Sequence, residues 1–187
     1  MEPLPAFPRS AMPTWLAEAL TSPHASVTLR AAESYDLPSL RVLYAQSRET
    51  ELAQMPWPPE AKRAFCDSQF DLQHRHYVSQ YSPAAAFLIV LQKQQPIGRL
   101  YLHWSADELR IVDILIASTS QQQGIGSALL QRLQEAVSKA TVATLSLHVE
   151  LHNGGAYRLY RRLGFSEVES RGGYLRMNWQ PDHGQLS

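Results

Sequence analysis

A short polar loop with two glycines is the segment best suited to bind a ligand. Residues 121–126 read Gln-Gln-Gln-Gly-Ile-Gly, after the apolar run 111–117 and before a helical pattern that starts at Ser127. The first amides of a helix have no intrahelical partners, and the aligned peptide dipoles add partial positive charge there. Gly124 and Gly126 carry no Cβ, so backbone can approach a ligand closely. This order predicts a phosphate site.

The residues after the glycines narrow the choice of ligand. A dinucleotide fold needs a third glycine and an acidic residue at the end of the next strand, and a Walker loop needs Gly-Lys followed by Ser or Thr. Here Gly124-Ile-Gly126 is followed by Ser-Ala-Leu-Leu, which fits neither pattern. Taken alone, a Gly-x-Gly at a helix start also fits a turn that uses glycine only for close packing.

A second set of spaced residues lies on the next predicted helix. Asn153, Ala156, Tyr160, Gly164 and Phe165 follow the pattern Asn-x-x-Ala-x-x-x-Tyr-x-x-x-Gly-Phe. Asparagine is a favoured N-cap and glycine a favoured C-terminal stop, so the pattern also marks the ends of a helix. A phenol with a pKa of about 10 can donate a proton to a leaving group. The alternative role of Tyr160 is that of an ordinary half-buried packing residue.

Together, these two patterns resemble the motifs of the Gcn5-related N-acetyltransferase (GNAT) family. The resemblance extends from about Val27 to Trp179. It implies an acetyl-CoA-dependent N-acetyltransferase that moves an acetyl group directly to a primary amine of a small molecule or peptide in a ternary complex. One alternative is a catalytically silent acyl-CoA-binding or interaction module on the same fold. Another is a nucleotide-binding protein that uses the same loop.

The resemblance also implies where acetyl-CoA would bind. Its pyrophosphate would lie on the loop amides, and its pantetheine arm would run beside the preceding strand, where that strand and the next splay apart. Tyr160 would protonate the departing thiolate. The implied cofactor residues are Ile114, Leu115, Ile116, Gln121, Gln122, Gln123, Gly124, Ile125, Gly126, Ser127, Asn153, Ala156 and Tyr160. The strand residues can equally be core, and Asn153 can equally be a helix cap; each can serve both purposes.

Two departures from the family pattern weaken the implied cofactor site modestly. Gln121 stands at a position where many members carry arginine, so a fixed cation is missing. The strand continues as Ile116-Ala-Ser118, where many members read Val-x-Pro. We therefore expect the loop to depend mainly on its amides and on the helix dipole.

The base that takes the proton of the attacking amine has several candidates. His148 and Glu150 alternate onto one face of the predicted strand 144–151, and His148 stands near the position of a glutamate in family members that acetylate protein N-termini. Asp113 interrupts an otherwise apolar strand, where a charge is unfavourable unless it is paired or used. A water chain is the remaining alternative, and a structural hydrogen bond is the commoner role of a strand histidine.

The resemblance also implies that the acceptor amine binds in a cavity lined by the first two helices, the connection between them and the last two strands. This connection, residues 48–57, carries Glu49 and Glu51, which could attract an ammonium group, and Trp57, which could cover an apolar part of the acceptor. The alternative is a solvated acidic turn with a tryptophan over the core. Cys66 is far in sequence from both motifs, so a covalent acyl-enzyme is not expected.

Hydrophobic periodicity indicates the elements that hold these residues. Their order is β-α-α-β-β-β-α-β-α-β-β, which predicts one mixed α/β sheet with helices on both faces. The resemblance to the GNAT family implies that this sheet is splayed at the acetyl-CoA site. We assign residues 1–26 to a proline-rich N-terminal extension that drapes over the domain or stays mobile. Residues 27–180 form the predicted N-acetyltransferase domain, and residues 181–187 form a C-terminal tail.

Composition restricts the location and the partners. The chain has 187 residues, and its 17 Lys+Arg balance 17 Asp+Glu, so no basic excess favours nucleic acid or a membrane. The single Cys66 argues against a Cys-rich metal site, and no metal is expected. No apolar run approaches the roughly 20 residues of a membrane span, and the N-terminus does not resemble a signal peptide. We expect a cytoplasmic protein, as a monomer or homodimer.

Overall fold

A computed structural model describes residues 3–21, 27–140 and 142–181 of the chain. Within these residues there are seven strands: β1 (Thr28–Ala31), β2 (Ala85–Gln92), β3 (Gln95–Trp104), β4 (Glu108–Ile116), β5 (Thr144–Glu150), β6 (Ser166–Arg171) and β7 (Tyr174–Trp179). The helices are α1 (Thr14–Leu20), α2 (Leu37–Ser47), α3 (Glu49–Ala53), α4 (Pro59–Tyr81), α5 (Ile125–Lys139) and α6 (Gly154–Arg162), with short 3-10 turns η1 (Ser34–Asp36) and η2 (Ser118–Ser120).

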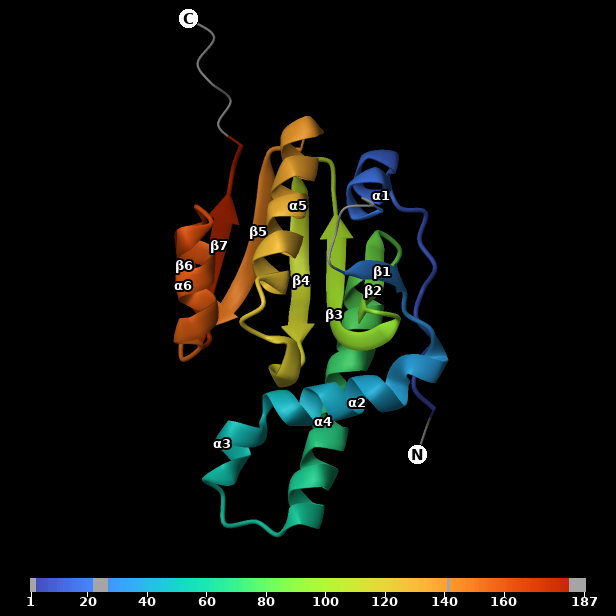
Figure 1. The fold of residues 1–187 in the computed structure, drawn as a ribbon, viewed down its shortest axis with the longest axis vertical. Helices are drawn as coiled ribbons and strands as arrows, with labels where there is room; N and C mark the ends of the chain where they lie inside the picture. The colour runs from blue at the N-terminus through green and yellow to red at the C-terminus, as the bar shows by residue number, and fades with distance from the viewer. Residues whose placement is uncertain (1–2, 22–26, 141, 182–187) are drawn as a thin grey trace, which may run out of the picture.

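The strands form one mixed sheet in the order β1-β2-β3-β4-β5-β7-β6 (Figure 1). Neighbouring strands are antiparallel except β4 and β5, which run parallel. One buried cluster joins α1, α5 and α6 to one face of the sheet, and a second cluster joins α2, α3 and α4 to the other face. The predicted fold, a mixed sheet with helices on both faces, is confirmed.

The sheet opens between β4 and β5. These two strands pair only from Glu108 opposite Thr144 to Ile111 opposite Leu147, although both continue beyond that point. The pairing of β4 with β3 continues to Ile116, with an irregularity that leaves Val112 without a partner. Because β4 stays bonded to β3 while it leaves β5, the predicted splay is present.

One short helix was not predicted. The connection at residues 48–57 contains α3, which the sequence suggested only as a turn. Leu52 is buried in the cluster beneath α2 and α4, and the Nη2 atom of Arg48 lies 2.8 Å from Oε1 of Glu51. Burial of one leucine and an (i, i+3) ion pair therefore stabilise this short helix, which contains too few residues to show a helical periodicity in the sequence.

The described part of the N-terminal segment packs on the rest of the fold. Phe7 is buried against the ring of His74 on α4, with centroids 4.7 Å apart. Leu16 and Leu20 of α1 join the core beside α5, and Arg132 of α5 donates to the Leu20 carbonyl at 2.6 Å. The boundary at residue 26 stays a prediction, and residues 182–187 of the predicted tail lie outside the described residues.

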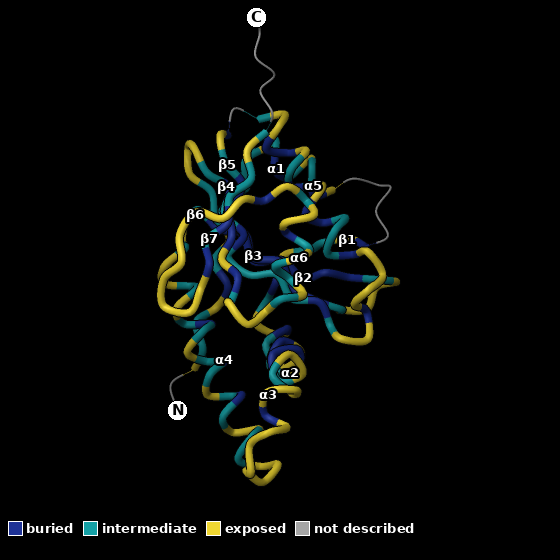
Figure 2. Tube along the Cα trace, turned by 90° about the vertical axis from the view of Figure 1, so that its left-hand side faces the viewer, coloured by how far each residue is buried: buried dark blue, intermediate teal, exposed yellow. Residues whose placement is uncertain are grey.

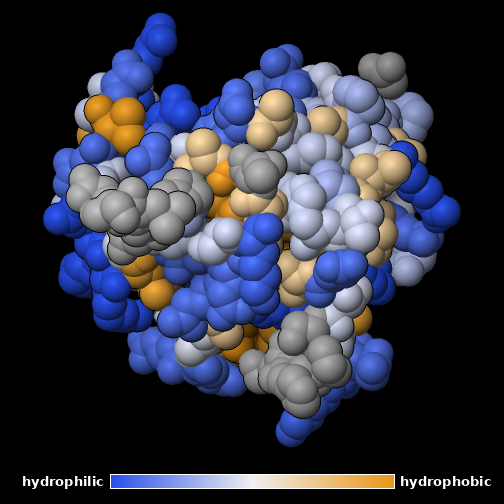
Figure 3. Space-filling view, turned by 90° about the horizontal axis from the view of Figure 1, so that it is seen from above, coloured by the Kyte–Doolittle hydropathy of each residue, from blue (hydrophilic) through white to orange (hydrophobic). Residues whose placement is uncertain are grey.

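The surface is mainly polar where the views display it. The β6–β7 hairpin stands at one side of the molecule, and β6 is exposed along its whole length (Figure 2). From the end opposite α3, small hydrophobic areas lie among hydrophilic ones (Figure 3). None of the described helices combines the length and apolarity needed to cross a membrane.

Gly98 is required where β3 and β4 lie closest. A Cβ at Gly98 would lie 2.4 Å from the carbonyl oxygen of Leu115 and 2.8 Å from Cδ1 of Ile116. Gly98→Ala should therefore lower the free energy of unfolding by about 2 kcal/mol, measured by urea denaturation. Gly155→Ala is the control, since its nearest neighbour would be Oδ1 of Asn153 at 3.8 Å. Equal stability of the two variants would contradict this prediction.

Candidate active site

The loop between β4 and α5 presents a row of unpaired amides. Gln122 and Gly124 have positive φ angles of 60° and 77°, which turn successive amides toward one side. The first helical bond is donated by Ala128 to the Gly124 carbonyl at 2.9 Å. Within the described residues, the amides of residues 122–127 donate to no protein acceptor. Residues 121–124 are exposed, so side chains do not cover these amides. We call the amides of residues 122–127 the anion seat.

Glutamine side chains hold the shape of this loop. Gln121 donates from Nε2 to the Ile116 carbonyl at 2.8 Å, which ties the loop back to the end of β4. Gln123 reaches the Thr119 carbonyl at 3.4 Å. Gln121 thus supports the backbone instead of offering the charge that arginine would provide.

Beside the loop, the last residues of β4 pack on both faces of the sheet. Ile114 and Ile116 contact the cluster under α5, and Leu115 contacts the cluster under α4. Beyond Ile111, β4 makes no pairing with β5 in the described structure, so its backbone edge faces the gap. The side chains of residues 114–116 therefore pack in the core while their backbone edge stays free. This agrees with the expectation that these residues can be both core residues and cofactor contacts.

Tyr160 is buried in the core cluster that also contains Ile111 and Leu147, the last residues paired between β4 and β5 before the gap. The helix that carries it begins at Asn153, whose Oδ1 accepts a bond from the Ala156 amide at 3.1 Å. Burial, and then the negative charge of Asp113, raise the pKa of Tyr160 to about 12. The phenol hydroxyl bonds to no other described residue, whereas Tyr157 donates to Oε1 of Glu167 at 2.6 Å. Tyr160 is therefore a protonated donor at neutral pH.

The charge of Asp113 is balanced by an arginine that the sequence did not single out. Arg99 on β3 is 2% exposed, and its Nη2 atom lies 2.5 Å from Oδ2 of Asp113. The same nitrogen donates to Oε1 of Gln73 on α4 at 2.6 Å. Burial alone would lower the pKa of Arg99, but the charge of Asp113 raises it. The available signal was a charged residue, Arg99, within the otherwise apolar middle of the strand next to the one that carries Asp113.

The two base candidates on β5 have different surroundings. His148 is exposed, and its Nδ1 lies 2.8 Å from Nη2 of Arg110 on β4. Partial burial, and then the charges of Arg110 and Arg176, lower the pKa of His148. Glu150 accepts a long bond from the Tyr174 hydroxyl at 3.4 Å and lies 3.0 Å from Nε2 of His152. Glu150 thus retains a half-buried, weakly bound carboxylate.

The residues expected to bind the acceptor lie at one end of the molecule, on and after α3 (Figure 1). Glu49 and Glu51 are exposed, and Glu51 pairs with Arg48. Trp57 is 41% exposed and packs edge-on against Phe65, with centroids 5.4 Å apart. No described contact joins these three residues to Tyr160.

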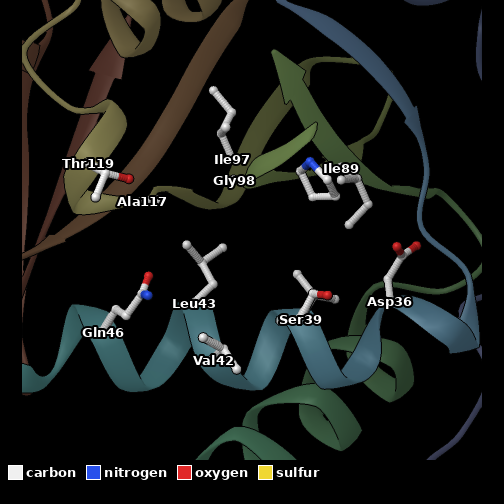
Figure 4. Close-up of a pocket in the computed structure, with 12 residues that line it drawn as sticks. Asp36, Ser39, Val42, Leu43, Gln46, Ile89, Ile97, Gly98, Ala117 and Thr119 are labelled. Carbon is white, nitrogen blue, oxygen red and sulfur yellow. The ribbon is translucent and has the colours of Figure 1, made fainter. Parts of the chain in front are cut away.

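A cavity of about 330 Å³ lies between α2 and the ends of β3 and β4. Figure 4 shows Leu43 and Gln46 of α2 directed toward Ala117 and Thr119, which precede the loop. Asp36 on its rim is bound by both terminal nitrogens of Arg30 at 2.7 Å, so it offers no free charge. The sequence did not predict this cavity, and its lining contains no group suited to acyl transfer.

Comparisons with known proteins agree with this geometry. The sequence model of the Acetyltransferase (GNAT) family matches residues 40–165. The [ribosomal protein bS18]-alanine N-acetyltransferase of Escherichia coli K12 is 31% identical over 147 residues, which are 79% of this chain and 86% of the relative.

Solved structures share the fold. The PaiA N-acetyltransferase from Thermoplasma acidophilum, in complex with coenzyme A, gives a TM-score of 0.65 at 18% identity, over 84% of this chain and 100% of that one. The ribosomal-protein-S18-alanine N-acetyltransferase from Escherichia coli gives 0.56 at 23% identity, over 82% and 93%. On the evidence of its loop, its splayed sheet and these matches, the chain belongs to the GNAT family of acetyltransferases.

Proposed function

We propose that this chain transfers an acetyl group from acetyl-CoA directly to the N-terminal amine of a protein or peptide in the cytoplasm. The observation that carries the proposal is the row of unpaired amides at residues 122–127, in a loop exposed at residues 121–124, beside the gap between β4 and β5. The curated relative acts on an alanine of a ribosomal protein, which supports a peptide acceptor over a small molecule. Residues 27–180 would be the catalytic domain.

In this proposal the loop amides and the start of α5 bind the pyrophosphate of acetyl-CoA. The free backbone edge of residues 114–116 bonds the pantetheine arm as an added strand would. Asn153 and Ala156, at the start of α6, border the same gap. The cofactor contacts come mainly from backbone groups, so their geometry depends on the loop shape, which the side chains of Gln121 and Gln123 help to hold.

The chemistry needs few protein groups. The amine nitrogen forms a bond to the thioester carbonyl carbon, and collapse of the tetrahedral species breaks the carbon–sulfur bond. Tyr160 donates its proton to the departing sulfur, and a proton from nitrogen returns through water to the phenolate. Arg99 and Gln73 hold Asp113 in the α4 side of the gap. Glu49, Glu51 and Trp57 are proposed to border the entrance for the acceptor.

The deciding experiment supplies the purified protein with acetyl-CoA and a panel of peptides that differ in their first residue. Release of free thiol and mass spectrometry of the peptides would report turnover and the acetylated atom. Acetylation of α-amines is the expected result. Tight binding of coenzyme A without turnover on any amine would favour the silent module, and thermal stabilisation by NAD or ATP instead of acetyl-CoA would favour a nucleotide-binding protein.

Gly124→Trp should weaken the binding of coenzyme A at least tenfold, roughly 1.4 kcal/mol, because the indole would occupy the anion seat. A Cβ at Gly124 meets no atom within 4 Å, so the fold has room for the new side chain. Gly172→Trp is the matched control, since Gly172 also has a positive φ and open space but lies in the β6–β7 turn. Titration calorimetry gives both affinities, and equal affinities would exclude this seat.

A further inference from the structure

The contact between Arg110 and His148 determines which ring nitrogen carries the proton. A guanidinium stays protonated and can only donate hydrogen bonds. With Nη2 of Arg110 at 2.8 Å from Nδ1 of His148, Nδ1 must therefore be the acceptor. A neutral imidazole has one N–H group, so it lies on Nε2. No described residue bonds to that nitrogen, and the side chain is exposed.

Arg110 is itself held in place. Its guanidinium carbon lies 5.9 Å from the centre of the Tyr81 ring on α4, which limits its freedom on the side away from His148. Its strand partner on β3 is His103. Because Arg110 contacts both the Tyr81 ring and the imidazole of His148, its guanidinium stays directed at Nδ1. The packing of the sheet therefore determines the tautomer of His148.

The charges that face His148 come from three strands. Arg110 and Glu108 lie on β4, Arg176 is its partner on β7, and Glu169 lies on β6. Glu108 accepts from Arg176 at 2.9 Å and also from the Ser146 hydroxyl, so its charge is already engaged. Partial burial, and then the charges of the two arginines, oppose protonation of the ring and lower the pKa of His148.

We propose that His148 is a hydrogen-bond donor that binds a carbonyl or carboxylate oxygen of the acceptor, and that Arg110 is the positioning residue that keeps it in this role. The proposal rests on the proposed function and makes it more specific. The usual base position of family members that acetylate protein N-termini then holds no base. The acceptor amine must arrive uncharged, and the proton that its nitrogen loses after the nitrogen–carbon bond forms passes through water to the phenolate of Tyr160.

If His148 is not a base, the rise of the reaction rate with pH should be set by the pKa of the acceptor amine and not by a group of the enzyme. The rate should rise with the fraction of neutral amine, whose pKa is about 8 for a peptide N-terminus. Two peptides whose amines differ in pKa should give profiles displaced by that difference. A profile that rises with one enzyme pKa for both peptides would overturn the proposal.

Variants at His148 separate a donor from a base. His148→Ala should raise the KM for the peptide about tenfold and change kcat by less than about threefold, because a binding contact is lost. His148→Gln should recover most of the KM, since its amide nitrogen can donate to the same oxygen. If both variants lower kcat about a hundredfold with KM unchanged, His148 is the base and the proposal is wrong.

The tautomer can be read without any activity assay. Long-range proton–nitrogen correlation spectra of the full chain should show His148 protonated at Nε2 and bare at Nδ1, with a ring pKa below its ordinary value of about 6.5. Arg110→Met should raise that pKa towards the ordinary value, although burial and Arg176 still lower it, with coenzyme A affinity by calorimetry as the control for folding. A proton on Nδ1 in the unmodified protein would overturn the proposal. Failure to acetylate any amine would defeat the proposed function but would leave the tautomer measurable.

Discussion

Arg99→Met is expected to lower the free energy of unfolding by about 3–5 kcal/mol, a factor of hundreds to thousands in the unfolding equilibrium. Methionine fills much of the same space, so the loss arises mainly from the charge of Asp113, which stays behind with 17% of its side chain exposed. The Oε1 atom of Gln73 loses its donor as well. Breaking one partner of a buried pair leaves an uncompensated charge, and that is the unfavourable state.

Urea denaturation of two further variants tests this reasoning. The double variant Arg99→Met/Asp113→Leu removes both charges and should regain most of the lost stability. Arg9→Met breaks a surface pair whose side chains are 85% and 44% exposed, so its effect should stay below about 1 kcal/mol. If the double variant is no more stable than Arg99→Met, packing around Phe70 and Tyr101 is responsible, and the electrostatic explanation fails.

Tyr160→Phe is expected to lower kcat about a hundredfold with little change in the Kd of coenzyme A. The substitution keeps the ring that packs 5.8 Å from Phe165 and removes only the hydroxyl. Burial raises the pKa of this phenol to about 12, so the wild-type residue stays protonated throughout the working pH range. The loss should therefore be of the same size from about pH 6 to pH 9.

Tyr157→Phe is the matched control on the same helix. Its hydroxyl is bound to Glu167 at 2.6 Å and takes no part in the proposed transfer, so turnover should be unchanged. Single-turnover kinetics would show whether the chemical step or product release limits each variant. Wild-type turnover by Tyr160→Phe would refute the role of this residue as the acid.

Local chemistry made the elements and the anion loop predictable. Glycine spacing, a polar turn and the start of an amphipathic helix indicate a conformation that depends on a few neighbouring residues, and the loop has that conformation at Gly124. Asn153 was expected to cap α6, and it does. The alternation of apolar residues placed strands at residues 144–150 and 108–116 to within a residue or two. Such features need no knowledge of distant contacts.

The partners of the charged side chains could not be predicted from the sequence, because charge pairs between strands depend on the register of those strands. Period-two alternation assigns a side chain to a face but does not identify its neighbour on the next strand. Asp113 was recognised as a charge that needed a partner, but only the pairing of β3 with β4 supplies Arg99. Likewise, only the arrangement of β4 beside β5 brings Arg110 to Nδ1 of His148, the contact from which we propose that His148 is a donor and not the base.

By itself, the sequence determined the family, the order of the elements and the residues of the anion loop, since these follow from local backbone preferences and periodicity. Only the tertiary structure decided which charged side chains pair and which cation contacts Nδ1 of His148. Those properties arise from contacts between strands that are far apart in the chain, where a shift of one residue would place different side chains together.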